Sequence, residues 1–340
     1  MNIIYILGAL FAFSLLVIVH EFGHFMMAKL NGVKVEEFSI GMGPKLFGVR
    51  RGETEYSIKL LPIGGYVKML GEDGEVTSDE RAFQNKSPLR KLSVVSAGPI
   101  MNIILAVVLY SIIAGSRGFL VPVVDNVVPG NPADLAGIRK GDKIIQVNDK
   151  AITTWEDFVT QVYNANGSTI SVIYKRGEET KSSTITPVKD EKENRFVVGV
   201  YPTLVENPGV SESIKYGFVE TTSLVKQTFG FFKTLFTGGA SVDDFGGPVT
   251  IMRVSGEAAK AGFLSLLSFA AYLSVQLAIF NVIPFPALDG GWIILFLIEF
   301  ITRKKIDSNK VGVLNYIGFV ILITLMIVVT IKDILYPVKF

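Results

Sequence analysis

Apolar residues are concentrated in four stretches of the chain that carry no charged side chain. Each stretch, taken with its continuation, reaches the roughly 20 residues that a helix needs to cross a bilayer. The first stretch starts at residue 3 and continues past two histidines to residue 28. The pattern predicts a polytopic α-helical membrane protein with four transmembrane helices, at residues 1–29, 92–116, 261–298 and 311–335. Met1 and Asn2 supply no basic side chain and no small-residue cleavage site follows, so we expect no cleavable signal peptide.

Residues 117–205 show a strand-like pattern between the second and third predicted helices. Runs such as VPVVDNVV, DKIIQVND and STISVIYKRG are rich in Val and Ile and are separated by Gly, Pro and Asn. One helix is expected behind Thr153 and Thr154, because Trp155, Phe158 and Val162 recur at helical spacing. We therefore predict one small β-rich domain there.

Residues 206–260 link this domain to the third predicted helix. Within them, 210–236 mixes lysines with phenylalanines at helical spacing, which predicts an amphipathic helix. Two placements stay open: the helix lies on the membrane surface, or it packs on the β-rich domain.

Residues 30–91 contain a β-hairpin candidate. Tyr56, Ile58 and Leu60 alternate with polar residues after the turn-like Arg51-Gly52. We expect 55–61 to be a strand whose edge either accepts an added strand from a partner or has a purely structural role.

Composition agrees with a membrane protein that has water-soluble parts. The 340 residues are 49% hydrophobic and 19% charged, with mean hydropathy +0.44. The net charge of +2 gives no reason to expect a nucleic-acid partner, and the absence of cysteine excludes disulfides and thiolate chemistry.

Basic residues near the predicted helix ends are unevenly divided between the two sides of the membrane, and the richer side is expected to be cytoplasmic. This orientation places 30–91 and the loop 299–310 in the cytoplasm, and 117–260 outside. The basic residues of the richer side are Lys29, Lys34, Lys86, Arg90, Lys91, Arg303, Lys304, Lys305 and Lys310. Those of the other side are Arg117, Arg253, Lys260, Lys332 and Lys339.

The first predicted helix contains the sequence HEFGH, with His20, Glu21 and His24. Residues four apart share a helix face, so the two imidazoles can bind one ion, and HExxH is the spacing with which metalloproteases bind zinc and use the glutamate as general base. These are the only histidines in the chain. The alternative, a hydrogen-bonded pair of core histidines, leaves three costly polar groups at membrane depth without a purpose.

A catalytic zinc site needs a third protein ligand, which must be Asp or Glu in this chain. Asp289 follows two prolines and precedes two glycines, which should break the helix and expose a carboxylate to a water-filled pocket. The expected orientation places Asp289 at the same membrane face as the histidines. Asp243 and Asp244 fall on the opposite face, and Glu299 is expected to be a solvated residue at a loop edge.

Together these motifs resemble those of bacterial site-2 proteases, membrane-embedded zinc metalloproteases with an extracytoplasmic PDZ domain. The matching stretches are HEFGH at 20–24, PIGGYVKMLGE at 62–72, GPIMN at 98–102, GNPADLAGIRKGDKIIQVND at 130–149 and NVIPFPALDGG at 281–291. The chain has room for one PDZ domain, where longer family members have two.

The resemblance implies one Zn²⁺ per chain, held by His20, His24 and Asp289, with Glu21 as the catalytic carboxylate. It also implies substrate contacts at Asn281, Pro284, Pro286 and Asn102, although each asparagine alone is equally compatible with a structural hydrogen bond between helices. The implied location is the bacterial cytoplasmic membrane, with the active site near the cytoplasmic face.

The implied substrates are single-pass membrane proteins such as anti-sigma factors or remnant signal peptides. Two other classes stay open: a catalytically silent PDZ scaffold, which leaves the HExxH residues and Asp289 unexplained, and a metal-ion transporter, whose polar groups should line a path across the bilayer. Metal content separates the three classes.

Overall fold

The computed structural model describes residues 3–72, 77–190, 195–237, 246–306 and 308–336. The chain divides into two compact units. One comprises Met1–Leu109 together with Gly230–Phe340, and the other is Tyr110–Phe229. Each is described separately below.

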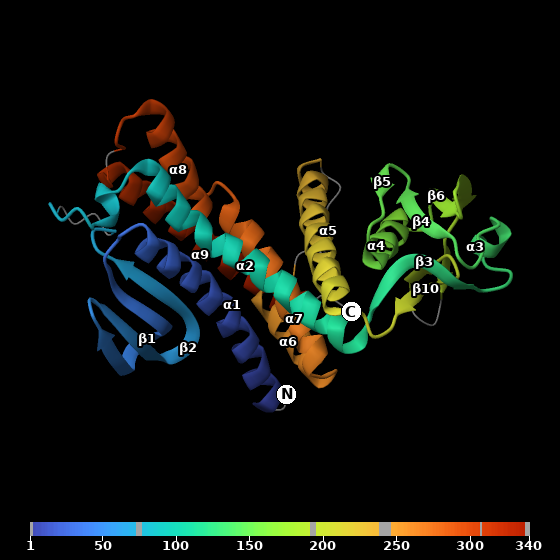
Figure 1. The fold of residues 1–340 in the computed structure, drawn as a ribbon, viewed down its shortest axis with the longest axis horizontal. Coiled ribbons are helices and arrows are strands. Elements are labelled where there is room, and N and C mark those ends of the chain that lie inside the picture. The colour runs from blue at the N-terminus through green and yellow to red at the C-terminus, as the bar shows by residue number, and fades with distance from the viewer. Residues whose placement is uncertain (1–2, 73–76, 191–194, 238–245, 307, 337–340) are drawn as a thin grey trace. The chain divides into compact units, whose positions relative to one another are not determined.

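Helices dominate the first unit (Figure 1). α1 packs against α6 and α7, and α6 also contacts α9. The helices are α1 (Ile3–Leu30), α2 (Pro88–Arg117, shared with the second unit), α6 (Pro248–Lys260), α7 (Phe263–Val282), α8 (Asp289–Thr302) and α9 (Ser308–Leu335), with a short 3₁₀ helix, η1, at Phe83–Asn85. Among the described residues, four helical spans are long and apolar enough to cross a membrane: Ala12–Leu30, Pro88–Arg117, Phe263–Val282 and Lys310–Leu335.

The predicted third helix, 261–298, consists of two helices. α7 ends at Val282 and α8 begins at Asp289, with Pro284 and Pro286 in the link between them. A proline has no N–H to donate and clashes with the preceding turn, so two prolines this close stop α7. The glycines expected to help break the helix lie instead in the first turn of α8. A Cβ on Gly290 would lie 2.0 Å from the Ile283 carbonyl oxygen, so only glycine lets α8 start so close to the link.

The hairpin predicted in 30–91 is longer than expected. β1 (Val35–Arg51) and β2 (Thr54–Met69) pair around the turn at Gly52, which has a φ of +62°. Ser57 is partnered by Ser39 on one side and by Gly48 on the other. Residues 55 to 58 are partnered on both sides, so the alternative in which the edge at Ser57 accepts an added strand is wrong. The last residues of β2, from 65 to 69, pair in the described structure only with the beginning of β1.

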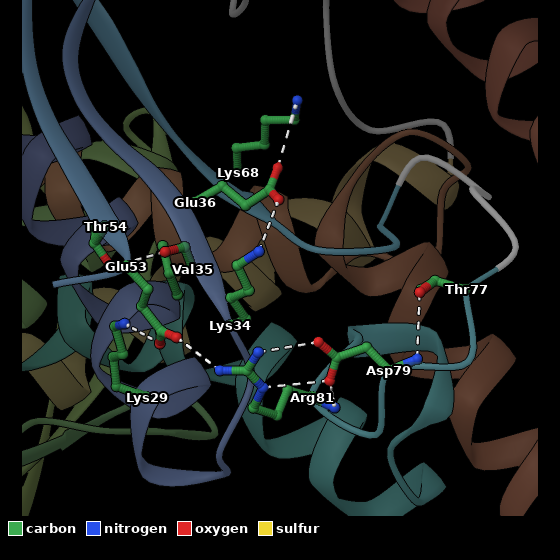
Figure 2. A network of polar contacts seen from close by, with 10 residues as sticks. All are labelled: Lys29, Lys34, Val35, Glu36, Glu53, Thr54, Lys68, Thr77, Asp79 and Arg81. Atoms are coloured by element: carbon green, nitrogen blue, oxygen red, sulfur yellow. Dashed lines mark hydrogen bonds and ion pairs between the residues drawn. The ribbon is translucent and has the colours of Figure 1, made fainter. Parts of the chain in front are cut away.

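Ion pairs attach the turn end of the hairpin to α1 (Figure 2). Glu53 accepts from Lys29 at 2.8 Å and from Arg81 at 3.0 Å. Arg81 in turn contacts Asp79, and the Thr54 hydroxyl donates to the Val35 carbonyl at 2.7 Å. The hairpin is thus fixed to the end of the helix that carries HEFGH.

The second unit contains the predicted β-rich domain. Its sheet has the strand order β10-β3-β4-β6-β7, with neighbours antiparallel and β5 paired to β4. Buried residues such as Ile144, Val147 and Phe158 form its core. The elements are β3 (Phe119–Val127), α3 (Pro132–Leu135), β4 (Lys143–Val147), β5 (Lys150–Ala151), α4 (Trp155–Ala165), β6 (Ile170–Arg176), β7 (Glu179–Ile185), β8 (Val188–Asp190), β9 (Arg195–Val197), β10 (Val200–Val205) and α5 (Val210–Phe236), which continues into the first unit.

The helix predicted at 210–236 is α5, and its residues up to 229 pack on the β-rich domain. Asp157, in the capping box that starts α4, accepts from the Ser223 hydroxyl and, at 3.1 Å, from the Gln227 amide. Packing on the domain is therefore confirmed for this part of the helix. Its opposite face keeps apolar side chains exposed, such as Phe218 at 63%.

Two carboxyl groups are buried where α4 meets α5. Glu156 and Glu220 each have one buried carboxylate oxygen without a hydrogen-bond partner. Burial, followed by the neighbouring Glu156 carboxylate, raises the pKa of Glu220 to about 8.

Candidate metal centre and active site

The two histidines lie one helical turn apart on α1 and point their Nε2 atoms at each other, 3.2 Å apart. Glycines bring α2 close to this face of α1. A Cβ on Gly23 would lie 2.4 Å from the Ala97 carbonyl oxygen, and a Cβ on Gly98 would lie 2.4 Å from His24 Nε2. The imidazoles therefore occupy space that any larger residue at position 98 would fill.

Asp289 completes the cluster from the first turn of α8. Its Oδ2 lies 3.2 Å from His20 Nε2 and 3.5 Å from His24 Nε2. This oxygen is buried and has no hydrogen-bond partner of suitable geometry. Among the described residues, only these three form a group of His, Asp or Glu side chains that could hold a metal ion.

The spacing of the three ligand atoms fits zinc. Zinc bonds to nitrogen and oxygen of about 2.0–2.1 Å in a tetrahedral site place two ligand atoms about 3.3 Å apart. The three observed separations are 3.2, 3.2 and 3.5 Å. The orphaned oxygen of Asp289 also gains a partner if a cation lies between the three atoms.

The second nitrogen of each imidazole has its own partner on α2. His24 Nδ1 lies 2.9 Å from the Val94 carbonyl oxygen, which can only accept, so Nδ1 carries the hydrogen and Nε2 is free to bind metal. His20 Nδ1 lies 3.2 Å from the side-chain amide nitrogen of Asn102, whose Oδ1 is buried without a partner. Rotating the amide by half a turn gives His20 an oxygen acceptor and satisfies that Oδ1.

Asn102 was expected to contact substrate, and that role stays a prediction. In the structure its side chain is 0% exposed and its amide nitrogen lies against His20. The hydrogen bond to His20 is the helix-to-helix bond left open as its alternative.

Glu21 lies beside the cluster in a cavity of about 250 Å³. The end of β2 forms one wall of this cavity with Tyr66, Val67 and Met69, and the Val67 backbone hydrogen-bonds the Glu21 carboxylate. The Tyr66 hydroxyl contacts both Glu37 and Lys59. Burial and the Glu37 carboxylate raise the pKa of Tyr66, so the hydroxyl stays protonated at neutral pH.

The predicted prolines lie in a second, smaller hollow. Pro284 and Pro286 line a groove of about 120 Å³ together with Leu314 and Asn315 of α9. Asn281 is half-buried in the last turn of α7 and lines neither this groove nor the Glu21 cavity.

The other three carboxylates considered as ligands have different outcomes. Glu299 is 8% exposed and paired with Lys91, so the expectation of a solvated residue is wrong. This pairing also leaves it unavailable as a ligand. Asp243 and Asp244 lie outside the described residues.

Several residues of the site escaped the sequence analysis. The Val94 carbonyl offers no signal, since any residue has one. Gly98 belongs to the GPIMN motif, in which the sequence analysis singled out only the asparagine. That a glycine is required at this position follows only from the close approach of α1. Asn315 accepts from the Ala287 N–H at 3.2 Å and holds a residue whose φ is +73°. No local pattern predicts that contact.

Two imidazoles and a carboxylate from a helix far along the chain are spaced for zinc, beside a glutamate on an apolar helix. This combination defines a membrane-bound metalloprotease. Comparison with known proteins agrees. The model of peptidase family M50 matches residues 8–325, and the chain belongs to this family. It is a zinc metalloprotease of the site-2 type.

Relatives that match over nearly their whole length support this assignment. The chain is 47% identical over 340 residues to a protein of Clostridium acetobutylicum named as a candidate zinc metalloprotease, and the match covers 100% of both chains. It is 30% identical over 411 residues to the zinc metalloprotease RasP of Geobacillus kaustophilus, covering 97% of each. A solved PDZ domain of a Listeria monocytogenes SdrC-like protein matches 24% of the chain and 85% of that domain, at 24% identity and a TM-score of 0.22.

Proposed function

We propose that this protein is an intramembrane protease that binds one zinc ion and hydrolyses peptide bonds within transmembrane segments of single-pass membrane proteins. The observation that carries the proposal is the convergence of His20, His24 and Asp289 beside Glu21, with HEFGH on a helix long and apolar enough to cross a membrane. A silent scaffold has no use for this convergence.

The proposed roles follow from the chemistry of each group. His20, His24 and Asp289 hold the zinc, which when bound acidifies water and polarises a peptide carbonyl. Glu21 takes the proton of the attacking water and delivers it to the leaving amine. Val94 and Asn102 keep the imidazoles in the tautomer and orientation that binding requires.

Substrate must reach the cavity with its backbone exposed, because a helix hides its peptide bonds. The end of β2 supports a route. Residues 65–69 pair on one side with β1, and the Val67 backbone faces Glu21. A locally unwound substrate segment adds to this edge as a further strand, so main-chain hydrogen bonds deliver it to the glutamate. The proposed edge thus differs from the one expected from the sequence.

The sidedness and the outer domain complete the proposal. The Lys and Arg distribution supports a cytoplasmic site and an extracytoplasmic β-rich domain. The GNPADLAGIRKGD stretch supports a PDZ assignment for that domain, which then either binds peptide or excludes bulky ectodomains. Anti-sigma factors or remnant signal peptides, already trimmed outside, are the proposed substrates.

The test of this function uses Glu21→Gln. The amide keeps the size of the side chain but cannot accept the proton, so purified protein should retain zinc at the wild-type level while cleavage of a single-pass model substrate collapses. The measurement pairs metal content with cleavage in proteoliposomes. Substantial cleavage by the Gln variant ends the role of Glu21, and a wild-type protein that holds zinc but cuts no transmembrane substrate ends the proposed function.

A further inference from the structure

A buried ion pair joins the beginning of α2 to the end of α8. Lys91 Nζ contacts Glu299 Oε2, and the two residues are 208 positions apart in the chain. Lys91 is 5% exposed and Glu299 8% exposed, so neither charge is solvated. Glu299 Oε1 also accepts from the Ile306 N–H at 3.2 Å.

Neither charge suits the helix that carries it. Lys91 lies in the first turn of α2, where the helix dipole favours acidic residues, and Glu299 lies in the last turn of α8, where it favours basic ones. Burial adds a desolvation cost to both. Neither residue stabilises the helix that carries it. What the pair stabilises is therefore the contact between α2 and α8.

The pair acts on the face of α8 that carries the third ligand. At 100° per residue, Asp289, Trp292, Phe296 and Glu299 fall within an arc of about 80°. Lys91 lies 4.6 Å over the Phe296 ring, which stacks on Trp292 at 5.5 Å. Trp292 lines the Glu21 cavity. The contact between Lys91 and Glu299 therefore orients this face of α8 toward α2 and the metal centre.

The contact at the end of α8 adds to what its beginning supplies. α8 follows a non-helical link, so its turns do not continue those of α7, and its first turn meets that link through Gly290 and Gly291, which have no side chain to interlock. α2, in contrast, already fixes both imidazoles through Val94 and Asn102.

We propose that Lys91 and Glu299 are positioning residues for the metal centre: their contact sets the rotation of α8 so that Asp289 meets the two histidines. This inference rests on the zinc site of the proposed function. α2 then positions all three ligands, the two histidines directly and Asp289 through α8. An atom about 5 Å from a helix axis moves roughly 0.9 Å when the helix turns by about 10°, several times the roughly 0.2 Å tolerance of a zinc bond.

The decisive variant is the double substitution Lys91→Met with Glu299→Met. It removes both charges together and leaves no buried charge unpaired, so the fold is retained or stabilised. We expect zinc to be released to a chelator about 10- to 100-fold faster than from wild type, comparable to the loss of metal affinity when a residue that orients a ligand is removed. The melting temperature of the zinc-free protein should stay at or above the wild-type value.

Three further proteins sharpen the comparison. Lys91→Arg keeps the charge and should retain near-wild-type zinc release. Glu299→Gln breaks the pair on one side and should release zinc quickly. Glu53→Gln breaks ion pairs in the same unit, in the network of Figure 2, and should leave zinc release unchanged.

A spectroscopic readout reports geometry directly. Cobalt bound in place of zinc should give a visible spectrum with reduced tetrahedral intensity in the double Met variant and a wild-type spectrum in Lys91→Arg. Wild-type zinc release and an unchanged cobalt spectrum in the double Met variant overturn the inference, and so does loss of zinc from Glu53→Gln to the same extent. Neither readout needs a substrate, so a protein that binds zinc but cuts nothing refutes the proposed function and leaves this inference intact.

Discussion

Gly98→Ala is a small change that should disable the metal centre. A Cβ at this position would lie 2.4 Å from His24 Nε2, 2.7 Å from its Cε1 and 2.8 Å from His20 Cε1. The atom that comes closest is the nitrogen proposed to bind zinc. The substitution therefore places a methyl group against the ligand atom itself.

The size of the effect follows from these distances. Ordinary contact begins near 3.4 Å, so the His24 ring must retreat by about 1.0 Å (3.4 − 2.4), against a zinc-bond tolerance of about 0.2 Å. Retreat is resisted because His24 Nδ1 is held by the Val94 carbonyl. Overpacking of this kind costs about 1–3 kcal/mol of stability, and a 1 Å misplacement near reacting groups costs about 100-fold in rate.

The assay compares three proteins in proteoliposomes: wild type, Gly98→Ala and Gly312→Ala. Gly312 is also a helical glycine, but among the described residues no atom beyond the adjacent backbone of its own helix lies within 4 Å of the Cβ it would gain, so its variant controls for the chemistry of the change. We expect Gly98→Ala to lose zinc to a chelator about 100-fold faster and to lose cleavage at least as strongly, and Gly312→Ala to behave as wild type. A Gly98→Ala protein that keeps zinc with the wild-type half-life and cleaves normally refutes the inferred crowding.

Three other changes should have different signatures. Asp289→Asn should lower zinc content after dialysis as well as cleavage, because a neutral amide is a poor zinc ligand; wild-type metal content would move the third ligand elsewhere. Ser57→Pro should lower the melting temperature, because Ser57 is paired on both sides and proline removes a hydrogen bond of the sheet, whereas an unchanged melting temperature would show that Ser57 lies at an edge. Glu220 has a folded-state pKa of about 8, above its ordinary 4.5, so the folded state binds the proton more tightly and unfolding free energy should fall as pH rises from about 4.5 to 8, by at most about 5 kcal/mol. Urea unfolding should show a steeper slope in wild type than in Glu220→Gln, where the buried Glu156, whose pKa is also raised, remains, and equal slopes would contradict the raised pKa of Glu220.

The meeting of His20, His24 and Asp289 could be predicted from the sequence because the chain offers so few alternatives. With two histidines and no cysteine, the third ligand had to be a carboxylate, and the prolines beside Asp289 marked a break in the helix. Hydropathy likewise located the four spanning helices, since apolar runs of this length have few other uses.

The supporting contacts could not be predicted because they join distant residues of ordinary type. Asn102 meets His20 across 82 positions, and Lys91 meets Glu299 across 208. Glu299 was misjudged since the basic run 303–305 follows it closely in sequence, while its burial depends on how α8 packs against α2. The second partner of Ser57 was missed for the same reason. Alternating apolar and polar residues identify a strand but do not show whether it pairs with one neighbouring segment or with two.

The histidine pair also makes the protein unusually open to spectroscopy. The chain has only these two histidines, and their Nδ1 atoms face different partners, a backbone carbonyl and a side-chain amide. Protein labelled with ¹⁵N in histidine alone should therefore give two sets of ring signals, both from the metal centre and distinguishable by Asn102→Ala. Because the chain lacks cysteine, single thiols for spin or fluorescent labels can be introduced without removing any natural one. Ring protonation and helix movement can thus be followed in one molecule, each without background from the rest of the chain.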